Sequence, residues 1–290
     1  MTSQNFRSAL FRLKLFSAIM LLLIAYDASA LMRALNTAAT GMAAMESNVN
    51  TISNNIANVN TTGYKSQRVE FEDLLNETVR EGGARSSHNT QHTVGYQVGS
   101  GSKVSAVRRI HSMGSPQITN RPYDLMIMGD GFFGVQVGNQ VLYTRDGSFT
   151  VDAQGMLKTR AGYPLLPGVT IPPNTMKLNI SEDGKVQAFL TNQTEPVELG
   201  QIPVFTFVNP AGMSDMGANL AKKTVGSGEP IQNVPGTENA GFIQQGSLES
   251  SNVSVMNEMT GLIKAQRAYE MNSKVMGIAD QMLQTVNNIR

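Results

Sequence analysis

The last part of the chain, from residue 252 to residue 290, has apolar residues that recur every seven positions. Rows with this spacing lie along one side of an α-helix, and no proline interrupts them. The sequence therefore predicts a helix of about 36 residues, roughly 54 Å long at 1.5 Å per residue. A stripe of that length needs a partner helix or neighbouring copies of the chain to cover it. The residues expected to form its seam are Leu262, Tyr269, Met276, Leu283 and Val286.

A second heptad pattern occupies the other end of the chain, between residues 32 and 59. Its two apolar rows are three residues apart, which is the spacing of the a/d seam of a coiled coil. Gly63 follows where the signal for the end of a helix is expected. The two ends are therefore predicted to pair as a coiled coil, and the alternative is a pair of surface helices on a globular domain. The seam residues at this end are Leu35, Met42, Met45, Val49, Ile52 and Ile56.

The middle of the chain alternates apolar and polar residues in short runs separated by turn residues, which is typical of β-strands. Asn139-Gln140 and Asp146-Gly147 each predict a tight hairpin turn. Short strands at this spacing predict antiparallel pairing. The expected fold class is α+β: long N- and C-terminal helices paired as a coiled coil, with a central all-β domain of antiparallel strands.

These patterns divide the chain into parts. Residues 32–66 and 248–290 are expected to form the terminal helical (coiled-coil) domain, and residues 98–247 the β domain. Residues 67–97 are polar and rich in turn residues, which predicts an extended arm, with a flexible linker as the alternative.

Residues 1–31 stand apart from the rest. They combine a basic start, an apolar run from Leu15 to Tyr26 and the tripeptide 28–30, Ala-Ser-Ala, which is the pattern of a secretory signal peptide. The apolar run is shorter than the ~20 residues that span a bilayer. Cleavage would follow Ala30. The alternative is that translation starts at Met32 and that residues 1–31 are a misassigned extension.

The composition of the chain argues against several kinds of partner and binding site. The net charge of +1 gives no electrostatic reason to expect a nucleic-acid partner. Cysteine is absent, which excludes disulfides and thiolate metal sites. His88 and His92 are four residues apart in a stretch with no helical pattern, so no metal site is predicted.

No sequence motif for catalysis is found. The chain has no phosphate-binding loop, dinucleotide fingerprint or nucleophile elbow, and we expect no cofactor and no catalytic residue. The enzymatic alternative is a secreted cell-wall hydrolase, which would need an acidic pair in a cleft of the β domain. A periplasmic adhesin-like binding module is a third hypothesis.

One block of residues near each end carries a family resemblance. Asn and Thr stop a helix by competing for its backbone hydrogen bonds, and Gly63 supplies a left-handed residue that lets the chain leave. The blocks resemble the signatures of the bacterial flagellar rod and hook family, and the chain is most similar to its distal rod members. The residues that carry the resemblance are Asn55, Ala57, Asn58, Thr62, Gly63, Tyr64 and Lys65 in the first block and Gln266, Arg267, Ala268 and Tyr269 in the second.

The resemblance implies a structural subunit of the flagellar distal rod in the periplasm, exported by the flagellar type III apparatus. Such a subunit polymerises into a helical tube that transmits motor torque to the hook. The implied partners are further copies of the chain, the proximal rod and hook proteins, and the surrounding ring proteins. Another axial protein, of the proximal rod or the hook, is the alternative within the family. Family members start near the position of Met32 without a cleaved signal, which favours the misassigned start.

Overall fold

The computed structural model describes residues 31–81, 85–87, 90–91, 94–191, 195–237 and 239–288. Residues 1–30 of the signal-like segment, together with His88 and His92, lie outside these ranges. The chain divides into two compact units. The first unit combines Met1–Thr51, Val69–Val107 and Thr260–Arg290, and the second combines Ile52–Arg68 with Arg108–Met259.

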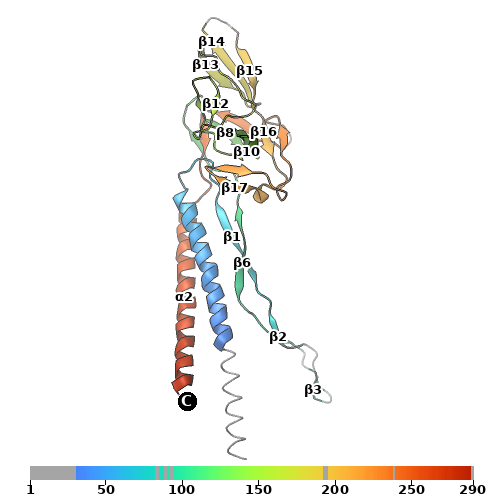
Figure 1. Ribbon diagram of the computed structural model, residues 1–290, viewed down its shortest axis with the longest axis vertical. Coiled ribbons are helices and arrows are strands. Elements are labelled where there is room, and N and C mark those ends of the chain that lie inside the picture. The colour runs from blue at the N-terminus through green and yellow to red at the C-terminus, as the bar shows by residue number, and fades with distance from the viewer. Residues whose placement is uncertain are drawn as a thin grey trace, which may run out of the picture. The chain divides into compact units, whose positions relative to one another are not determined.

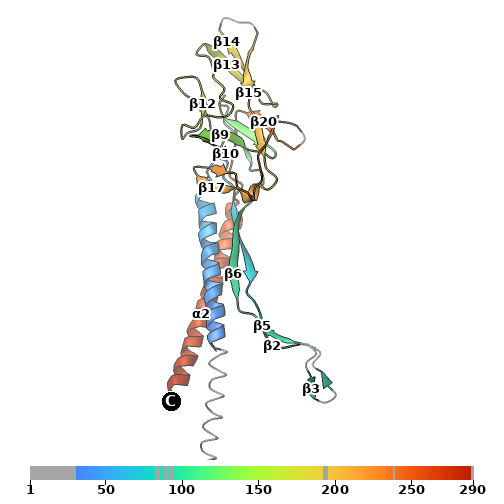
Figure 2. The same ribbon diagram turned by 45° about the vertical axis from the view of Figure 1, so that its right-hand side comes forward.

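Two long helices form most of the first unit. Residues 31–57 are helical, and α2 runs over Val255–Asn288. Within this unit the helices lie side by side and run in opposite directions (Figures 1 and 2). A Cβ atom added to Gly41 would be 2.7 Å from Nδ2 of Asn272, so the Asn272 side chain packs against the backbone of the first helix at this level. The prediction of long N- and C-terminal helices is confirmed.

The segment predicted as an extended arm forms a two-stranded ribbon with the residues that follow it. β1 (Gln67–Asp73) pairs with β6 (Ser102–Arg109), β2 (Glu77–Arg80) with β5 (Tyr96–Val98), and β3 (Arg85–Ser87) with β4 (Thr90–Gln91). Inside the first unit the ribbon contacts the first helix, because Arg33 forms an ion pair of 3.0 Å with Glu77. Gly101 also lies against that helix, where a Cβ would be 2.2 Å from Oγ1 of Thr40.

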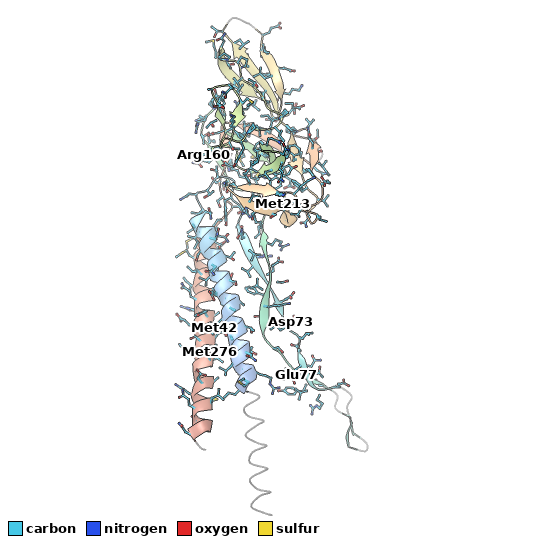
Figure 3. All side chains as sticks on the ribbon, in the orientation of Figure 1. Met42, Asp73, Glu77, Arg160, Met213 and Met276 are labelled. Carbon is cyan, nitrogen blue, oxygen red and sulfur yellow. The ribbon has the colours of Figure 1, made fainter. Side chains whose placement is uncertain are left out.

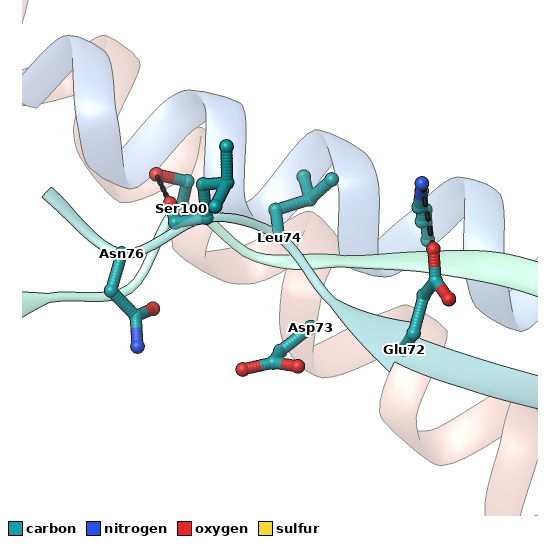
Figure 4. Close-up of a pocket in the computed structure, with 7 residues that line it drawn as sticks. Glu72, Asp73, Leu74, Asn76 and Ser100 are labelled. Carbon is teal, nitrogen blue, oxygen red and sulfur yellow. Dashed lines mark hydrogen bonds and ion pairs between the residues drawn. The ribbon is translucent and has the colours of Figure 1, made fainter.

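A bend in the ribbon separates β1 from β2. Leu74 and Asp73 point to opposite sides of it (Figure 4). The bend is held by the Ser100 hydroxyl, which donates to the carbonyl oxygen of Leu75 at 2.8 Å, and by an ion pair of 2.6 Å between Lys103 and Glu72. The ribbon is thus an ordered hairpin over its described residues.

Apart from the ends of the two long helices, the described residues of the second unit form short antiparallel strands and one 3-10 turn, η1 (Pro210–Gly212). One sheet has the order β17-β18-β10-β9 and another the order β13-β14-β15. The other pairs in this unit are β11-β12, β16-β19, β20-β8 and β21-β7. The prediction of an α+β chain with a central domain of antiparallel strands is confirmed. The strand bounds are β7 Pro116–Ile118, β8 Leu125–Met128, β9 Phe133–Val137, β10 Gln140–Thr144, β11 Thr150–Val151, β12 Leu157–Lys158, β13 Thr175–Ile180, β14 Lys185–Leu190, β15 Val197–Gln201, β16 Val204–Thr206, β17 Ser214–Gly217, β18 Leu220–Lys222, β19 Ile231–Asn233, β20 Phe242–Gln245 and β21 Ser247–Glu249.

One of the two predicted hairpins is wrong. The hairpin predicted at Asn139-Gln140 forms one residue earlier, since Gly138-Asn139 joins β9 to β10 and Gln140 is the first residue of β10. However, β10 pairs with β9 and β18, and β11 pairs with β12, so Asp146-Gly147 closes no hairpin. A Cβ on Gly147 would be 1.6 Å from the carbonyl oxygen of Leu125. Glycine is therefore needed here because its missing Cβ lets the backbone pass close to the core strand β8, and not because it forms a two-residue turn.

Candidate functional site

The predicted seam residues lie on the two long helices, and the structure buries them to different extents. Ile52 is buried, Tyr269 is 43% exposed, and the side chain of Val286 lies outside the described residues. The other seam residues are half-buried: Leu35, Met42, Met45, Val49, Ile56, Leu262, Met276 and Leu283. Met42 and Met276, one from each helix, lie at a similar level of the pair (Figure 3).

Alanines, rather than the large seam residues, are the most buried positions of the helices in the first unit. Ala38, Ala44, Ala265 and Ala279 are each at most 4% exposed. Small side chains let two helix backbones approach closely, which pushes the larger seam residues to the sides of the contact. The half-buried seam residues therefore retain surface that a single subunit does not cover.

A flank of α2 beside this contact also carries large apolar residues. With 100° between successive residues, Met271, Val275, Ile278 and Met282 fall within about 60° of one another on the flank next to Ala279, and Ile263 lies further round on the exposed side. They are 46% to 61% exposed. We call these five residues the outer stripe. A contiguous row of exposed apolar side chains is typical of a protein–protein contact.

In the second unit, a buried ion cluster joins the two chain ends to the β domain. Nζ of Lys65 lies 2.6 Å from Oε1 of Glu249, and Nη1 of Arg145 lies 3.4 Å from Oε2 of the same carboxylate. The three side chains are between 1% and 4% exposed. Lys65 also donates to the carbonyl oxygen of Ser112 at 2.7 Å, and the Gly114 N–H donates to Glu249 at 2.9 Å. One carboxylate thus neutralises cations from two distant parts of the sequence.

A second polar network surrounds Asn55, which is 1% exposed. Its Oδ1 accepts hydrogen bonds from the Gln67 N–H at 2.9 Å and from the Tyr64 hydroxyl at 3.2 Å. Its Nδ2 donates to the carbonyl oxygen of Gln67 at 2.8 Å and to Oε1 of Glu258 at 3.3 Å. A buried amide with all of these partners fixes the path of the chain as it leaves the first helix.

The other family-signature residues have more varied surroundings. Thr62 accepts a hydrogen bond of 3.0 Å from Nδ2 of Asn219 through its carbonyl oxygen, and Asn58 donates to the carbonyl oxygen of Asn54 at 2.9 Å. Ala268 is half-buried, whereas Ala57, Gln266 and Arg267 are exposed.

Three residues of these polar networks are not among the predicted site residues: Glu249, Arg145 and Asn252. Oδ1 of Asn252 accepts from the Ser66 N–H at 2.7 Å, and its Nδ2 donates to the carbonyl oxygen of Ile110 at 2.8 Å. It therefore ties the segment before α2 to the segment after the first helix.

Burial and neighbouring charge shift two pKa values at this junction. Burial lowers the pKa of Lys65, the charge of Arg145 lowers it further, and Glu249 partly offsets both effects. Burial, with the positive charges of Lys65, Arg145 and Arg109, lowers the pKa of His111 to about 4. His111 is therefore neutral at pH 7, in edge contact with the ring of Phe132 at 5.5 Å.

The depressed pKa of His111 predicts a loss of stability in acid. Between its ordinary pKa of about 6.5 and about 4, the unfolded chain binds a proton that the folded chain does not, so unfolding becomes easier as the pH falls. We expect this group to remove about 3 kcal/mol from the free energy of unfolding between pH 7 and pH 4. Urea unfolding of the unsubstituted chain and of His111→Gln checks this. The difference between the two should change over that pH range, and a constant difference would contradict the assignment.

Among the described residues, no group of three or more His, Cys, Asp or Glu side chains is arranged to hold a metal ion. Across the same residues, no helix is long and apolar enough to cross a membrane.

Comparison with known proteins gives consistent matches along the chain. Residues 35–65 match the family model "Flagella basal body rod protein", residues 126–188 match "Flagellar hook protein FlgE/F/G D1 domain", and residues 244–289 match "Flagellar basal body rod FlgEFG protein C-terminal". The flagellar basal-body rod protein FlgG of Borreliella burgdorferi is 47% identical over 90% of this chain and 99% of its own length. The chain belongs to the FlgG family of flagellar basal-body rod proteins.

Further FlgG proteins support the assignment. FlgG of Caulobacter vibrioides is 45% identical over 89% of this chain and all of its own length, and FlgG of Bacillus subtilis is 36% identical over 90% of this chain. The chain is a structural subunit of the flagellar distal rod, located in the basal body, as the resemblance predicted. Among solved structures, the Helicobacter pylori hook protein FlgE2 matches 64% of this chain and 43% of its own, with 13% identity and a TM-score of 0.22, which is too low to support an argument.

Proposed function

We propose that this FlgG-family chain polymerises through its two terminal helices into a helical tube that crosses the periplasm and transmits motor torque to the hook. The outer stripe of α2 is the observation that carries the proposal. Its apolar side chains remain about half exposed in one subunit, on a flank of α2 beside the buried Ala279. A second copy of the chain would remove that surface from water.

Within one subunit, the terminal helices are proposed to pair as an antiparallel coiled coil. Two contacts support this, one in each unit: Gly41 lies against Asn272, and Asn55 donates to Glu258. The step from Gly41 to Asn55 and the step from Asn272 back to Glu258 are both two heptads long. Equal steps on both helices are what a heptad seam produces.

Between subunits, the outer stripe is proposed to pack against the exposed small-residue side of a neighbour's first helix. Ala39 and Ala43 are exposed on that side, and they offer room for the larger methionine and isoleucine side chains. Such a contact joins two different surfaces. It therefore does not close on itself but continues as a helical filament. The predicted seam residues would complete their burial in the same assembly.

Several partners follow from this role. The relatives are named as basal-body rod proteins, and a further relative in Bacillus subtilis is named flagellar hook-basal body complex protein FlhP. We propose that the rod contacts the proximal rod and hook proteins at its ends and the ring proteins around it, after export by the flagellar type III apparatus. The two-stranded ribbon of β1 to β6 is proposed to stiffen the tube.

The subunit is proposed to act mechanically, without catalysis. The relatives are named as rod proteins, and the buried carboxylate of Glu249 is neutralised between Lys65 and Arg145 rather than poised for chemistry. The D1 family model is shared by hook and rod proteins, so another axial position is the alternative. Relatives named FlgG at 36% to 47% identity favour the distal rod.

Substitutions in the outer stripe should prevent rod assembly while leaving the folding of the single subunit almost unchanged. Because Met271 and Ile278 are 61% and 53% exposed, Met271→Asp with Ile278→Asp should change the free energy of unfolding of the monomer by only about 0.5 kcal/mol. The same pair should abolish rods in electron micrographs of basal bodies and should abolish motility. Ser273→Asp, also exposed on α2, is the matched control and should leave rods intact. Normal rods in the double variant would disprove the proposed contact.

A further inference from the structure

The three-stranded sheet β13-β14-β15 of the second unit has two unlike edges. β14 lies in the middle and pairs with both neighbours, so β13 and β15 are the outer strands (Figure 1). An outer strand presents backbone N–H and C=O groups that can pair with another chain. What each edge offers a partner depends on the residues beside it.

The β13 edge borders a groove of about 380 Å³ that carries two cations. Arg121 and Lys177 line the groove and are exposed. The apolar part of the lining comes from Met176, which is 76% exposed, and from Pro122 and Tyr123. None of the described residues that line this groove has a carboxylate. The groove is therefore suited to an acidic segment with apolar side chains.

Backbone groups of β13 are directed toward this groove, as the contacts of Gln245 show. The Ile180 N–H donates to Oε1 of Gln245 at 3.0 Å, and Nε2 of Gln245 donates to the carbonyl oxygen of Leu178 at 3.1 Å. A side-chain amide thus takes the hydrogen bonds that a neighbouring strand would make. It does so only at the Ile180 end, whereas the groove lies along the Thr175 end of the same strand.

The β15 edge has the opposite charge. Glu195 and Glu198 are exposed, and Glu198 alternates along β15 with half-buried Val197 and Leu199. On β13, Lys177 is exposed beside the buried Leu178. Glu198 and Lys177 therefore both occupy the solvent side of the sheet.

We propose that in the assembled rod the β15 edge of one copy docks into the groove along β13 of the next copy, so that the sheet continues between subunits. Glu195 and Glu198 then lie opposite Arg121 and Lys177. The two edges of one sheet face away from each other, so a single subunit cannot make this contact, and a second copy is the occupant. The contact joins unlike edges and propagates along a filament, as the proposed rod requires. The inference rests on the self-assembly proposed above.

This contact is small, so it holds subunits together only when the terminal helices have already placed them side by side. Reversing one charge, by Lys177→Glu or Glu198→Lys, should still allow rods to form. Isolated rods of either variant should dissociate at a salt concentration several-fold lower than unsubstituted rods. The double variant should recover most of the loss, because the attraction is restored with its signs exchanged. Single variants as resistant as unsubstituted rods, or a double variant no better than the singles, would overturn the proposal.

The absence of natural cysteine permits a direct test in rods isolated from cells. With Lys177→Cys and Glu198→Cys in every subunit, mild oxidation should give a ladder of disulfide-linked oligomers on a denaturing gel. The matched control pairs Glu198→Cys with Lys185→Cys, since Lys185 is an exposed lysine on the central strand β14, and it should give no ladder. Intact rods without a ladder, or an equal ladder in the control, would refute the edge contact while leaving the proposed function standing. Absence of rods from cells that produce the unsubstituted chain would instead refute the proposed function.

Discussion

Glu249→Gln is expected to lower the free energy of unfolding of the second unit by about 3–5 kcal/mol, because it leaves two buried cations without a counter-charge. Lys65 and Arg145 both lie against this carboxylate, and all three side chains are at most 4% exposed. Arg145 would keep hydrogen bonds to the carbonyl oxygens of Ile127 and Gly129, but dipoles of this kind do not replace a full negative charge. Urea unfolding followed by circular dichroism measures the loss.

Two variants test whether the unbalanced charge is the cause. Lys65→Met removes one cation and leaves Arg145 and Glu249 as a balanced pair, so it should cost clearly less than Glu249→Gln. Glu229→Gln breaks the ion pair with Lys223, which is largely exposed, and should cause no measurable loss. The explanation fails if Glu249→Gln is no more harmful than Glu229→Gln.

The helical half of this fold could be predicted because its signal is periodic. Heptad rows at both ends give long helices whatever surrounds them, and α2 runs over Val255–Asn288, close to the predicted span. The heptad pattern could not predict which positions on the two helices are the most buried. It favoured large residues such as Met42 and Met276, whereas the close approach at Gly41 gives the most buried positions to alanines. Interhelical distance depends on three-dimensional packing and has no one-dimensional signature.

The junction of the chain ends could not be predicted from local pattern. Lys65 lies 184 residues from Glu249, and Arg145 lies 104 residues from it. No periodicity links positions so far apart. The family block drew attention to Lys65, but its partner Glu249 lies outside both family blocks. A buried carboxylate next to a helix start has no distinguishing sequence context.

The ribbon and the missed hairpin show how tertiary contact overrides local preference. β2 is exposed along its whole length, so it lacks the alternation by which a strand is recognised. Its pairing with β5 follows from the continuation of the β1-β6 hairpin. Asp146-Gly147 has typical turn chemistry, yet the glycine is needed because the Leu125 backbone passes within reach of a Cβ. A two-residue motif cannot show whether its glycine forms a hairpin turn or allows a close backbone contact.

Gly63 and Gly138 form a natural pair for measuring what the close approach at the first helix end contributes. Both have left-handed backbone conformations, with φ of 67° and 58°. A Cβ at Gly63 would lie 2.7 Å from backbone atoms of Arg145 and Asp146, whereas a Cβ at Gly138 would meet nothing within 4 Å. The two positions therefore share the conformational cost of alanine and differ only in the space available.

Gly138→Ala should lower the free energy of unfolding by about 1–2 kcal/mol, because alanine is strained in a left-handed backbone conformation. Gly63→Ala should lower the free energy of unfolding by this amount plus about 1–3 kcal/mol, because the polypeptide must move away from the Arg145-Asp146 backbone that follows β10. That movement would also disturb the hydrogen bond of 2.8 Å from the Gly63 N–H to the Glu249 carbonyl oxygen. We therefore expect Gly63→Ala to impair motility and Gly138→Ala to leave it unchanged. Unfolding can be followed by tyrosine fluorescence, since the chain has no tryptophan. Equal losses in the two variants would show that the end of the first helix is not anchored at this contact.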